Sequence, residues 1–261
     1  MKLEILQIDA FAEKIFAGNP AAVCPLENWI SDSQMQAVAA ENNLSETAFF
    51  VSNGTGFDLR WFTPTSEINL CGHATLASAF VIFNFLEPQR TSVDFQTKSG
   101  RLSVARDGDL LSMDFPALPP WECGQVPADL LHGLSPAPAN VWQIKNNYFV
   151  IYESEEDVRL AKPDFALLEK LHPYGVGITA PGRRSDFVSR YFVPSYGIPE
   201  DPVTGSLHCS LVPYWAKRLK KSTLHARQLS KRGGNLWCEL REDRVILKGK
   251  SVLYLRGSIT I

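Results

Sequence analysis

The sequence predicts an α+β protein made of two similar domains, each a mostly antiparallel, barrel-like sheet wrapped around a central buried helix. Two observations lead to this prediction. An aromatic segment stopped by proline, Arg60 to Pro64, returns as Arg190 to Pro194, at an offset of 130 in a chain of 261 residues. Strand patterns outnumber helix patterns, and each half holds one strongly apolar helix. A fixed long period of this kind indicates duplicated architecture.

The first half consists of short apolar runs separated by turn residues. Ser31 and Gln34 fit a capping box at the start of a helix, and Asn42-Asn43 can end that helix because asparagine tolerates the left-handed conformation. Glu46 then lies at a junction between a helix and a strand. The predicted elements are strands at 3–10, 21–24, 48–51 and 57–62, a helix that opens at 31–34, a buried helix from 72 to 85, and a hairpin at 100–113.

The second half repeats this order. A strand at 187–193 precedes a helix at 204–219, which Pro213 should kink or locally break. A hairpin at 234–247 follows, and the proline-rich stretch after Asp114 is the predicted linker. We therefore place the domains at 1–118 and 119–250. The last strand, 251–259, has no counterpart in the first half, so residues 251–261 can cross back to the first domain.

Composition narrows the function. A net charge of −2 and a pI near 6.2 give no electrostatic footprint for nucleic acid, so we expect a small-molecule substrate. The longest apolar stretch is too short to span a membrane, and the N-terminus lacks the core of a signal peptide. The five cysteines contain no Cys-x-x-Cys pair, which fits a reducing cytosol and a cytoplasmic protein.

The segment before the first buried helix is the first candidate for chemistry. Gly72 lets the backbone approach a ligand closely, and the free amides of the first turn favour an anion. Cys71 would there have a lowered pKa as a reactive thiolate, or would simply be a small buried residue. The segment alone leaves both readings open. His73 can carry a proton near neutral pH or be a satisfied core histidine.

The matching segment of the second half begins at Asp201, which the offset of 130 places opposite Cys71. Asp201 can handle a proton, while Thr204, Gly205 and Ser206 can offer amides and hydroxyls to a carboxylate. Helix capping alone would explain the same residue types. Glu46, in surroundings of low polarity, is a candidate general base.

Several common motifs are missing. The chain has no Gly-x-Gly-x-x-Gly, no Walker loop, no Gly-x-Ser-x-Gly elbow and no His-x-x-x-His pair. Its cysteine and histidine spacings do not suit zinc. The sequence therefore predicts chemistry that needs no metal and no cofactor.

Six segments spread over nearly the whole chain closely resemble the phenazine-biosynthesis PhzF-like family, whose fold is that of diaminopimelate epimerase. They occur in the family's order and are jointly specific. The segments are Gln7-Ile8-Asp9-Ala10-Phe11, Gly18-Asn19-Pro20, Leu44-Ser45-Glu46-Thr47-Ala48-Phe49, Arg60-Trp61-Phe62-Thr63-Pro64, Cys71-Gly72-His73-Ala74-Thr75-Leu76-Ala77 and Glu200-Asp201-Pro202-Val203-Thr204-Gly205-Ser206.

The resemblance implies a cofactor-independent isomerase that moves a proton on a small carboxylate-bearing substrate by general acid/base catalysis, in a cleft between the domains. The family's catalytic residues correspond to Glu46, His73 and Asp201, and its serine corresponds to Ser206. The resemblance also implies a homodimer. The expected substrate-binding residues are Asn19, Cys71, Gly72, Thr204, Gly205 and Ser206.

Two alternatives stay open. One is a racemase or epimerase that uses Cys71 with Glu46 or Asp201. Related epimerases use one cysteine per half, and because Asp201 stands in the region of the second cysteine, a two-thiol mechanism is disfavoured. The other alternative is a non-catalytic binding or scaffold protein on the same fold.

Overall fold

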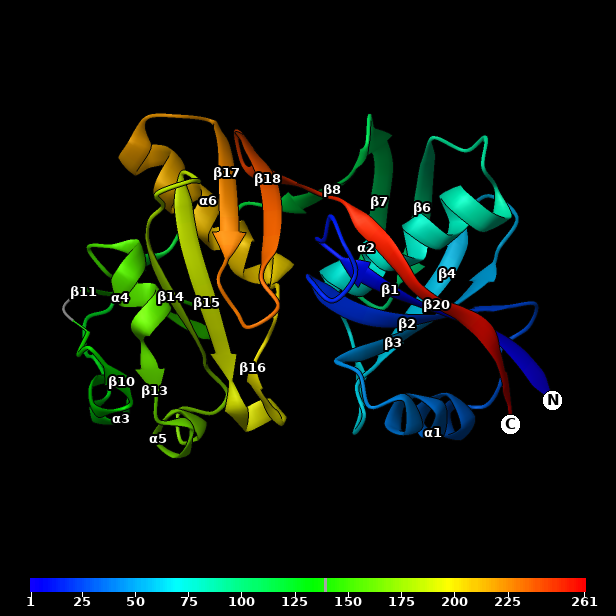
Figure 1. The fold of residues 1–261 in the computed structure, drawn as a ribbon, viewed down its shortest axis with the longest axis horizontal. Coiled ribbons are helices and arrows are strands. Elements are labelled where there is room, and N and C mark those ends of the chain that lie inside the picture. Colours follow the sequence, from blue (N-terminus) through cyan, green and yellow to red (C-terminus); the bar gives the residue numbers. More distant parts are fainter. Residues whose placement is uncertain (139) are drawn as a thin grey trace. The chain divides into compact units, whose positions relative to one another are not determined.

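The computed structural model describes residues 1–138 and 140–261 and divides the chain into two compact units (Figure 1). Unit 1 comprises Met1–Asp114 and Lys248–Ile261, and unit 2 comprises Phe115–Leu247. The predicted fold class is confirmed, because each unit is a mostly antiparallel sheet around one buried helix. Within the described ranges, no helix has the length and apolar character that a membrane crossing requires.

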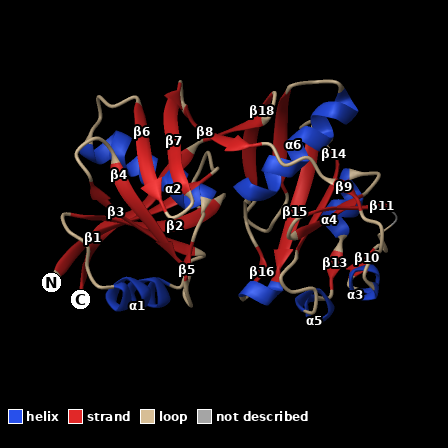
Figure 2. Ribbon diagram, turned by 180° about the vertical axis from the view of Figure 1, so that it is seen from behind, coloured by secondary structure: helices blue, strands red, loops and turns tan. Residues whose placement is uncertain are grey.

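Unit 1 surrounds helix α2 with strands (Figure 2). Its sheet order is β20-β1-β2-β3-β4-β6-β7-β8, and only the β2–β3 and β4–β6 pairs are parallel. Short β5 lies beside β4. The elements are β1 Lys2–Ala10, β2 Asn19–Leu26, α1 Asp32–Asn42, β3 Glu46–Ser52, β4 Phe57–Phe62, β5 Glu67–Ile68, α2 Gly72–Val81, η1 Ile82–Leu86, β6 Ser92–Thr97, β7 Gly100–Asp107, β8 Leu110–Pro116 and β20 Ser251–Thr260.

Helix α2 is buried all round, as predicted. Eight of its ten residues are buried, and the helix packs against β1, β2 and β3. It ends earlier than expected, because after Val81 the chain continues to Leu86 as a π-helix. The side chain of Asn84 donates a hydrogen bond to the carbonyl of Phe80 (2.7 Å), and such side-chain donors compete with the regular helical ladder.

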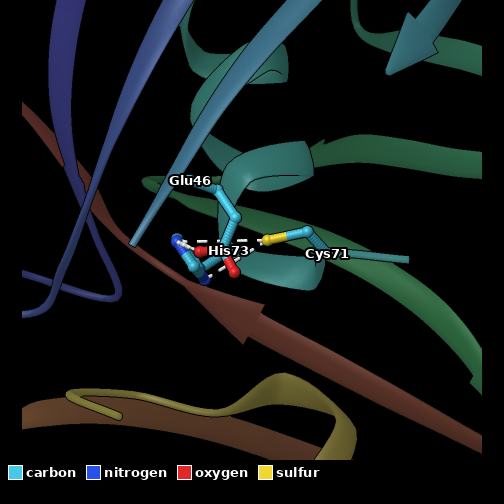
Figure 3. Close-up of side chains that lie close together, drawn as sticks. All are labelled: Glu46, Cys71 and His73. Atoms are coloured by element: carbon cyan, nitrogen blue, oxygen red, sulfur yellow. Dashed lines mark hydrogen bonds and ion pairs between the residues drawn. The ribbon is translucent and has the colours of Figure 1, made fainter. Parts of the chain in front are cut away.

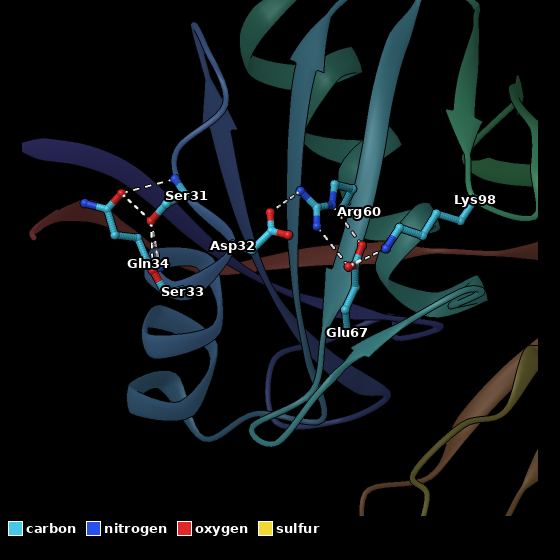
Figure 4. Close-up of polar contacts among 7 residues, drawn as sticks. All are labelled: Ser31, Asp32, Ser33, Gln34, Arg60, Glu67 and Lys98. Atoms are coloured by element: carbon cyan, nitrogen blue, oxygen red, sulfur yellow. Dashed lines mark hydrogen bonds and ion pairs between the residues drawn. The ribbon is translucent and has the colours of Figure 1, made fainter.

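The capping predictions for α1 are confirmed. Ser31 accepts a hydrogen bond from the amide of Gln34, and the Gln34 side chain accepts one from the amide of Ser31 (Figure 4). Asn43 ends the helix in the left-handed conformation, with φ of 49°. The chain therefore turns directly into β3, whose first residue is Glu46.

Unit 2 repeats the pairing pattern of unit 1. Its order is β9-β11-β12-β14-β15-β17-β18, and the β12–β14 and β15–β17 pairs are parallel. The elements are β9 Trp121–Glu122, α3 Ala128–His132, β10 Leu134–Ser135, β11 Asn140–Ile144, β12 Asn147–Ile151, α4 Glu155–Leu160, β13 Lys162–Pro163, α5 Phe165–Glu169, β14 Gly175–Pro181, β15 Phe187–Val193, η2 Pro194–Tyr196, β16 Ile198–Glu200, α6 Gly205–Leu219, β17 Thr223–Gln228, β18 Gly234–Arg241 and β19 Arg244–Gly249.

Helix α6 is continuous through Pro213, so the predicted local break is wrong. Proline has no N–H, and the carbonyl four residues earlier, that of Cys209, loses its partner in the helix. The amide of Leu118 donates a hydrogen bond to this carbonyl instead (2.9 Å). The helix can therefore keep its proline without leaving a buried acceptor unsatisfied.

Both units place an arginine–glutamate pair beside the start of the buried helix. Arg60 on β4 donates two hydrogen bonds to Glu67 on β5, at 2.8 and 2.9 Å (Figure 4). Arg190 on β15 donates two to Glu200 on β16 at the same distances. Bidentate pairs of this kind fix geometry as well as charge, so they tie the short strand to the sheet.

We expect Glu67→Gln to lower the free energy of unfolding at pH 7 by about 1–2 kcal/mol. Hydrogen bonds from Arg60, followed by Lys98, hold the pKa of Glu67 at about 2, below its ordinary 4.5. A carboxylate whose pKa is depressed on folding stabilises the protein above its unfolded pKa and loses this effect as pH falls toward the folded value. Denaturant titrations at pH 7 and pH 3 measure the difference.

The exposed Glu27→Gln variant is the matched control and should behave like wild type. An equal loss of stability in Glu67→Gln at both pH values would contradict the role assigned to the ion pair.

Candidate active site

Asn19 begins β2 behind a turn that only glycine can make. Gly18 has φ of 66°, and a Cβ atom there would lie 2.1 Å from the carbonyl oxygen of Ala10. Asn19 itself is fully buried, and its Nδ2 lies 3.1 Å from Nδ1 of His73. The turn therefore brings the start of β2 to the start of α2.

Glu46 reaches the same place from β3. Strand β3 runs parallel to β2, with Glu46 opposite Ala21. Helix α1, which joins the two strands, returns the chain to the end of the sheet at which β2 begins. The Glu46 side chain is only 12% exposed. A carboxylate in such a position needs a partner, because burying an unpaired charge is costly.

Cys71 and His73 come from the first turn of α2. Cys71 is the N-cap residue, and its side chain makes no capping bond to the helix. Gly72 is the first helical residue, and His73 is 5% exposed. The sequence prediction that these residues open a buried helix is confirmed.

The three side chains form one compact cluster (Figure 3). Nε2 of His73 lies 3.0 Å from Oε2 of Glu46. Sγ of Cys71 lies 3.5 Å from Nδ1 and 4.0 Å from Nε2 of His73. The imidazole therefore stands between a carboxylate and a thiol, with Asn19 beside Nδ1. Such a group can hold, accept or deliver a proton within a dry pocket.

His73 is protonated more readily than an ordinary histidine. Burial by itself lowers its pKa, but the interactions with Cys71 and Glu46 outweigh burial and raise the pKa well above 6.5. Of these two partners, Glu46 is the one that stabilises the imidazolium near neutral pH, because the thiol of Cys71 keeps its proton there. A carboxylate 3.0 Å from an imidazole favours the charged form of that imidazole.

Of the two interpretations left open for Cys71, the structure supports a buried thiol and not one with a lowered pKa. Burial, followed by the charge of Glu46, raises the pKa of this thiol to about 11, although His73 and the backbone of Ala74 act in the opposite direction. The helix start favours a thiolate, but the thiol is buried and lies close to the carboxylate of Glu46. Cys71 is therefore a neutral thiol near pH 7.

The cluster contains the donor types of a metal site. One donor atom each from Glu46, Cys71 and His73 lie within 4.8 Å of one another. In the arrangement described, however, the thiol is protonated and the histidine shares its proton with Glu46, so the donors are engaged with one another. A metal would have to displace these protons. The absence of a resident metal stays a prediction, which elemental analysis tests.

The predicted residues of the second half lie at the start of α6, in unit 2. Thr204 is the N-cap residue, Gly205 is the first helical residue and buried, and Ser206 is exposed. The hydroxyl of Thr204 donates to Oδ2 of Asp201 at 2.5 Å, and its amide donates to Oε1 of Gln228 at 2.9 Å. Both groups of Thr204 that were expected to meet a substrate carboxylate are thus engaged inside unit 2.

Gln228 is a residue that the sequence analysis missed. It belongs to no motif, and it contacts the Asp201–Thr204 segment from a strand more than 20 residues further along the chain. Only the pairing of β17 with β15, which is a contact between distant segments, brings it there.

The structure also corrects the expected equivalence of Cys71 and Asp201. The offset of 130 relates the first residue of β4, Phe57, to the first residue of β15, Phe187. The N-cap residues are Cys71 and Thr204, so by the start of the helix the offset has grown to 133. The longer connection in unit 2, which contains η2, accounts for the shift. The residue equivalent to Cys71 is therefore Thr204.

The sequence comparisons agree with these observations. Residues 8–257 match the family described as phenazine biosynthesis-like protein, PhzC-PhzF. An uncharacterized isomerase of Pseudomonas aeruginosa is 50% identical over 259 residues, which cover 99% of each chain. The crystal structure of a PhzF family protein from Enterococcus faecalis has a TM-score of 0.96 at 44% identity and covers 100% of each chain.

A more distant likeness concerns the fold alone. A hydroxyproline epimerase from Agrobacterium vitis is 10% identical to the chain and has a TM-score of 0.59, with 99% of this chain and 92% of that chain covered. The architecture is thus shared with a protein that is only 10% identical in sequence.

We expect Cys71 to react slowly with iodoacetamide. A thiol whose pKa is about 11 is almost entirely protonated at pH 8, so alkylation should be about 100-fold or more slower than for an unshielded thiol. Peptide mass spectrometry over a time course measures the rate, with the less buried Cys123 as the internal comparison. Modification of Cys71 ahead of Cys123 would contradict a neutral thiol.

We also expect purified protein to carry no stoichiometric zinc, as the missing ligand spacings predict. Inductively coupled plasma mass spectrometry after dialysis without chelator measures this. About one zinc per chain, lost in a His73→Asn variant, would instead assign the cluster as a metal site, since zinc sites of this kind bind tightly.

Proposed function

Because the chain belongs to the phenazine biosynthesis-like protein family, we propose that it is an isomerase that moves a proton on a small carboxylate-bearing substrate by general acid/base catalysis. In this proposal Glu46 is the base and His73 its partner. The relative named as an isomerase, at 50% identity over nearly the full length, supports the reaction class.

One observation carries the proposal: Glu46 and His73 form a buried ion pair, 3.0 Å apart, at the start of a helix that is otherwise apolar. A buried pair costs desolvation energy, and an apolar pair of similar size would often stabilise a fold as well or better. A buried ion pair that costs desolvation energy, and whose histidine has a shifted pKa, is typical of a catalytic site.

The reaction needs only a proton to be moved. Glu46 removes a proton from one carbon, which breaks a C–H bond and leaves the electron pair delocalised into the substrate. A proton is returned to another carbon by the same carboxylic acid or by the imidazolium of His73. No oxidant or reductant is needed, because one C–H bond breaks and one forms. The free amides at the start of α2 suit the substrate carboxylate.

The Asp201–Ser206 segment of unit 2 is proposed to contribute to substrate binding. The motif resemblance supports this, and Ser206, the exposed residue of the first turn of α6, is its proposed contact with the carboxylate. Measuring turnover in Ser206→Ala and Asp201→Asn variants tests the contribution of the segment.

Epimerisation by Cys71 is the weaker alternative. A thiol with a pKa of about 11 is a poor base near neutral pH. The residue in the equivalent position of unit 2 is Thr204, whose hydroxyl is bonded to Asp201, so a second thiol is missing there. These observations favour the carboxylate over the thiol as the base.

The first test screens small carboxylates for uptake of deuterium from heavy water. With a substrate in hand, Glu46→Gln should lower kcat by about 10²- to 10⁴-fold, because the amide keeps the shape but cannot accept the proton. Cys71→Ser should cost far less. The surface variant Glu41→Gln serves as the matched control, and circular dichroism checks that all variants fold.

A fully active Glu46→Gln variant would end the proposal. A folded but inactive Cys71→Ser variant with an active Glu46→Gln would move the assignment to a thiol-based epimerase. If no carboxylate exchanges with the wild-type protein, yet such a compound binds with Glu46-dependent affinity, a binding protein is indicated instead.

A second test uses pH. Because the interactions with Cys71 and Glu46 outweigh burial and raise the pKa of His73 well above 6.5, the imidazolium persists through neutral pH and is lost only as pH rises through the raised value. If His73 delivers the proton, kcat should fall on the alkaline side, and this descending limb should be missing in His73→Asn, which retains only a low, flat activity. An unchanged alkaline limb in His73→Asn would assign it to another group.

A further inference from the structure

We propose that Gln228 is a positioning residue that orients the carboxylate of Asp201 through the hydroxyl of Thr204. This inference rests on the proposed function for its effect on turnover, while the geometry that carries it lies wholly within unit 2.

Gln228 occupies a position where an apolar residue would be expected. It is the last residue of β17, between Ser189 of β15 and Gly234 of β18, and it is 0% exposed. Leu224 and Ala226 precede it on the same buried face of the strand. A buried carboxamide destabilises the fold unless its groups are bonded, so this residue needs partners within the protein.

Among the described residues, all hydrogen bonds of the Gln228 side chain go to one short segment, Asp201–Thr204. Oε1 of Gln228 accepts a hydrogen bond from the amide of Thr204 at 2.9 Å. Nε2 donates to the carbonyl of Asp201 at 2.7 Å and to Oγ1 of Thr204 at 3.2 Å. The carboxamide therefore bonds to both ends of the Asp201–Thr204 turn. No shorter side chain at this position would reach the Asp201 carbonyl, the Thr204 amide and the Thr204 hydroxyl.

These bonds fix the direction of the Thr204 hydroxyl. Its oxygen accepts from Nε2 of Gln228, so its own proton is free to point elsewhere. The remaining neighbour is Oδ2 of Asp201, at 2.5 Å, and a carboxylate oxygen can only accept. Gln228 thus turns Thr204 into a donor toward Asp201. A hydrogen bond to an ionised carboxylate holds its orientation and favours its charged form.

His208 completes the support of Thr204. Its Nδ1 donates to the carbonyl of Thr204 at 2.7 Å. Burial lowers the pKa of His208 to about 4, so this ring is neutral near pH 7 and its Nδ1 proton is kept for the carbonyl. The amide, the carbonyl and the hydroxyl of Thr204 are therefore all held by unit 2, and the residue acts on Asp201 rather than on a ligand.

The first arm of the test is independent of activity. The carboxyl ¹³C signal of Asp201, assigned with an Asp201→Asn variant, is titrated in wild type and in Gln228→Met. Without Gln228 the hydroxyl is no longer directed at Asp201, and the midpoint should move to higher pH by about half a unit to one unit. An unchanged midpoint would overturn the proposal.

The second arm measures turnover with the substrate found by deuterium exchange. Gln228→Met should lower kcat about 10-fold or more, with little change in KM. In Gln228→Glu the ionised side chain can still accept a hydrogen bond but cannot donate one. When the pH falls, the carboxyl group is protonated and can donate again, so the activity relative to wild type should recover. Equal activity of all three proteins would contradict the proposal.

The matched control is Thr179→Val, also in unit 2. Thr179 is buried. Its hydroxyl donates a hydrogen bond to the carbonyl of Val188 and accepts one from Nε1 of Trp215, and both partners lie outside the Asp201–Thr204 segment. Its variant should lose stability but keep both the Asp201 midpoint and kcat. If Thr179→Val reproduced the effects of Gln228→Met, the effect would be one of general destabilisation, and the proposal would be overturned.

If wild type shows no exchange with any carboxylate, the proposed function fails, and the titration of Asp201 still decides the role of Gln228.

Discussion

Helix α2 has no polar face, and this constraint organises unit 1. A helix that is apolar on every side must be covered on every side, so β1, β2 and β3 pack against it and the sheet curves to continue around it. At the ends of such a helix, backbone groups lack partners within the helix and can meet polar groups from other elements. The first turn, with its unpaired amides, is consequently where polar side chains gather.

The buried ion pair follows from this arrangement. Asn19, Glu46 and His73 come from two strand starts and a helix start, and each is fixed by backbone geometry before any side chain is placed. Burial and then the charge of Glu46 raise the pKa of the Cys71 thiol, while Cys71 and Glu46 together raise the pKa of the His73 imidazole. The buried cluster thus combines a readily protonated histidine with a neutral cysteine thiol.

The two units share their strand pairing but have diverged at these positions. Strand β14 of unit 2 corresponds to β3 of unit 1. The first residue of β3 is Glu46, which lies opposite Ala21, whereas the first residue of β14 is Gly175. At the helix starts, Cys71 corresponds to Thr204. Unit 2 therefore retains the architecture and the arginine–glutamate pair, while its helix start has become a hydrogen-bonded support for Asp201.

Much of this could be predicted from local patterns. The strand at 57–62, the capping box at Ser31 and the left-handed Asn43 depend on neighbouring residues, and the sequence contains those neighbours. The raised pKa of Cys71 could not be foreseen, because it depends on burial by distant segments and, after burial, on Glu46, which is 25 residues away and approaches only through the parallel pairing of β2 and β3. Gln228 was missed for the same reason, and an ungapped offset could not reveal the longer connection before α6.

Pro213 has a consequence for the connection between the units. By removing one amide from α6, it leaves the carbonyl of Cys209 open to a main-chain donor from outside the helix, and the amide of Leu118 takes that place. The amide of Ala117 is likewise bonded, to the carbonyl of Asp243. The proline therefore creates an anchoring point, the carbonyl of Cys209, that fastens the incoming chain within a few residues of its entry into unit 2.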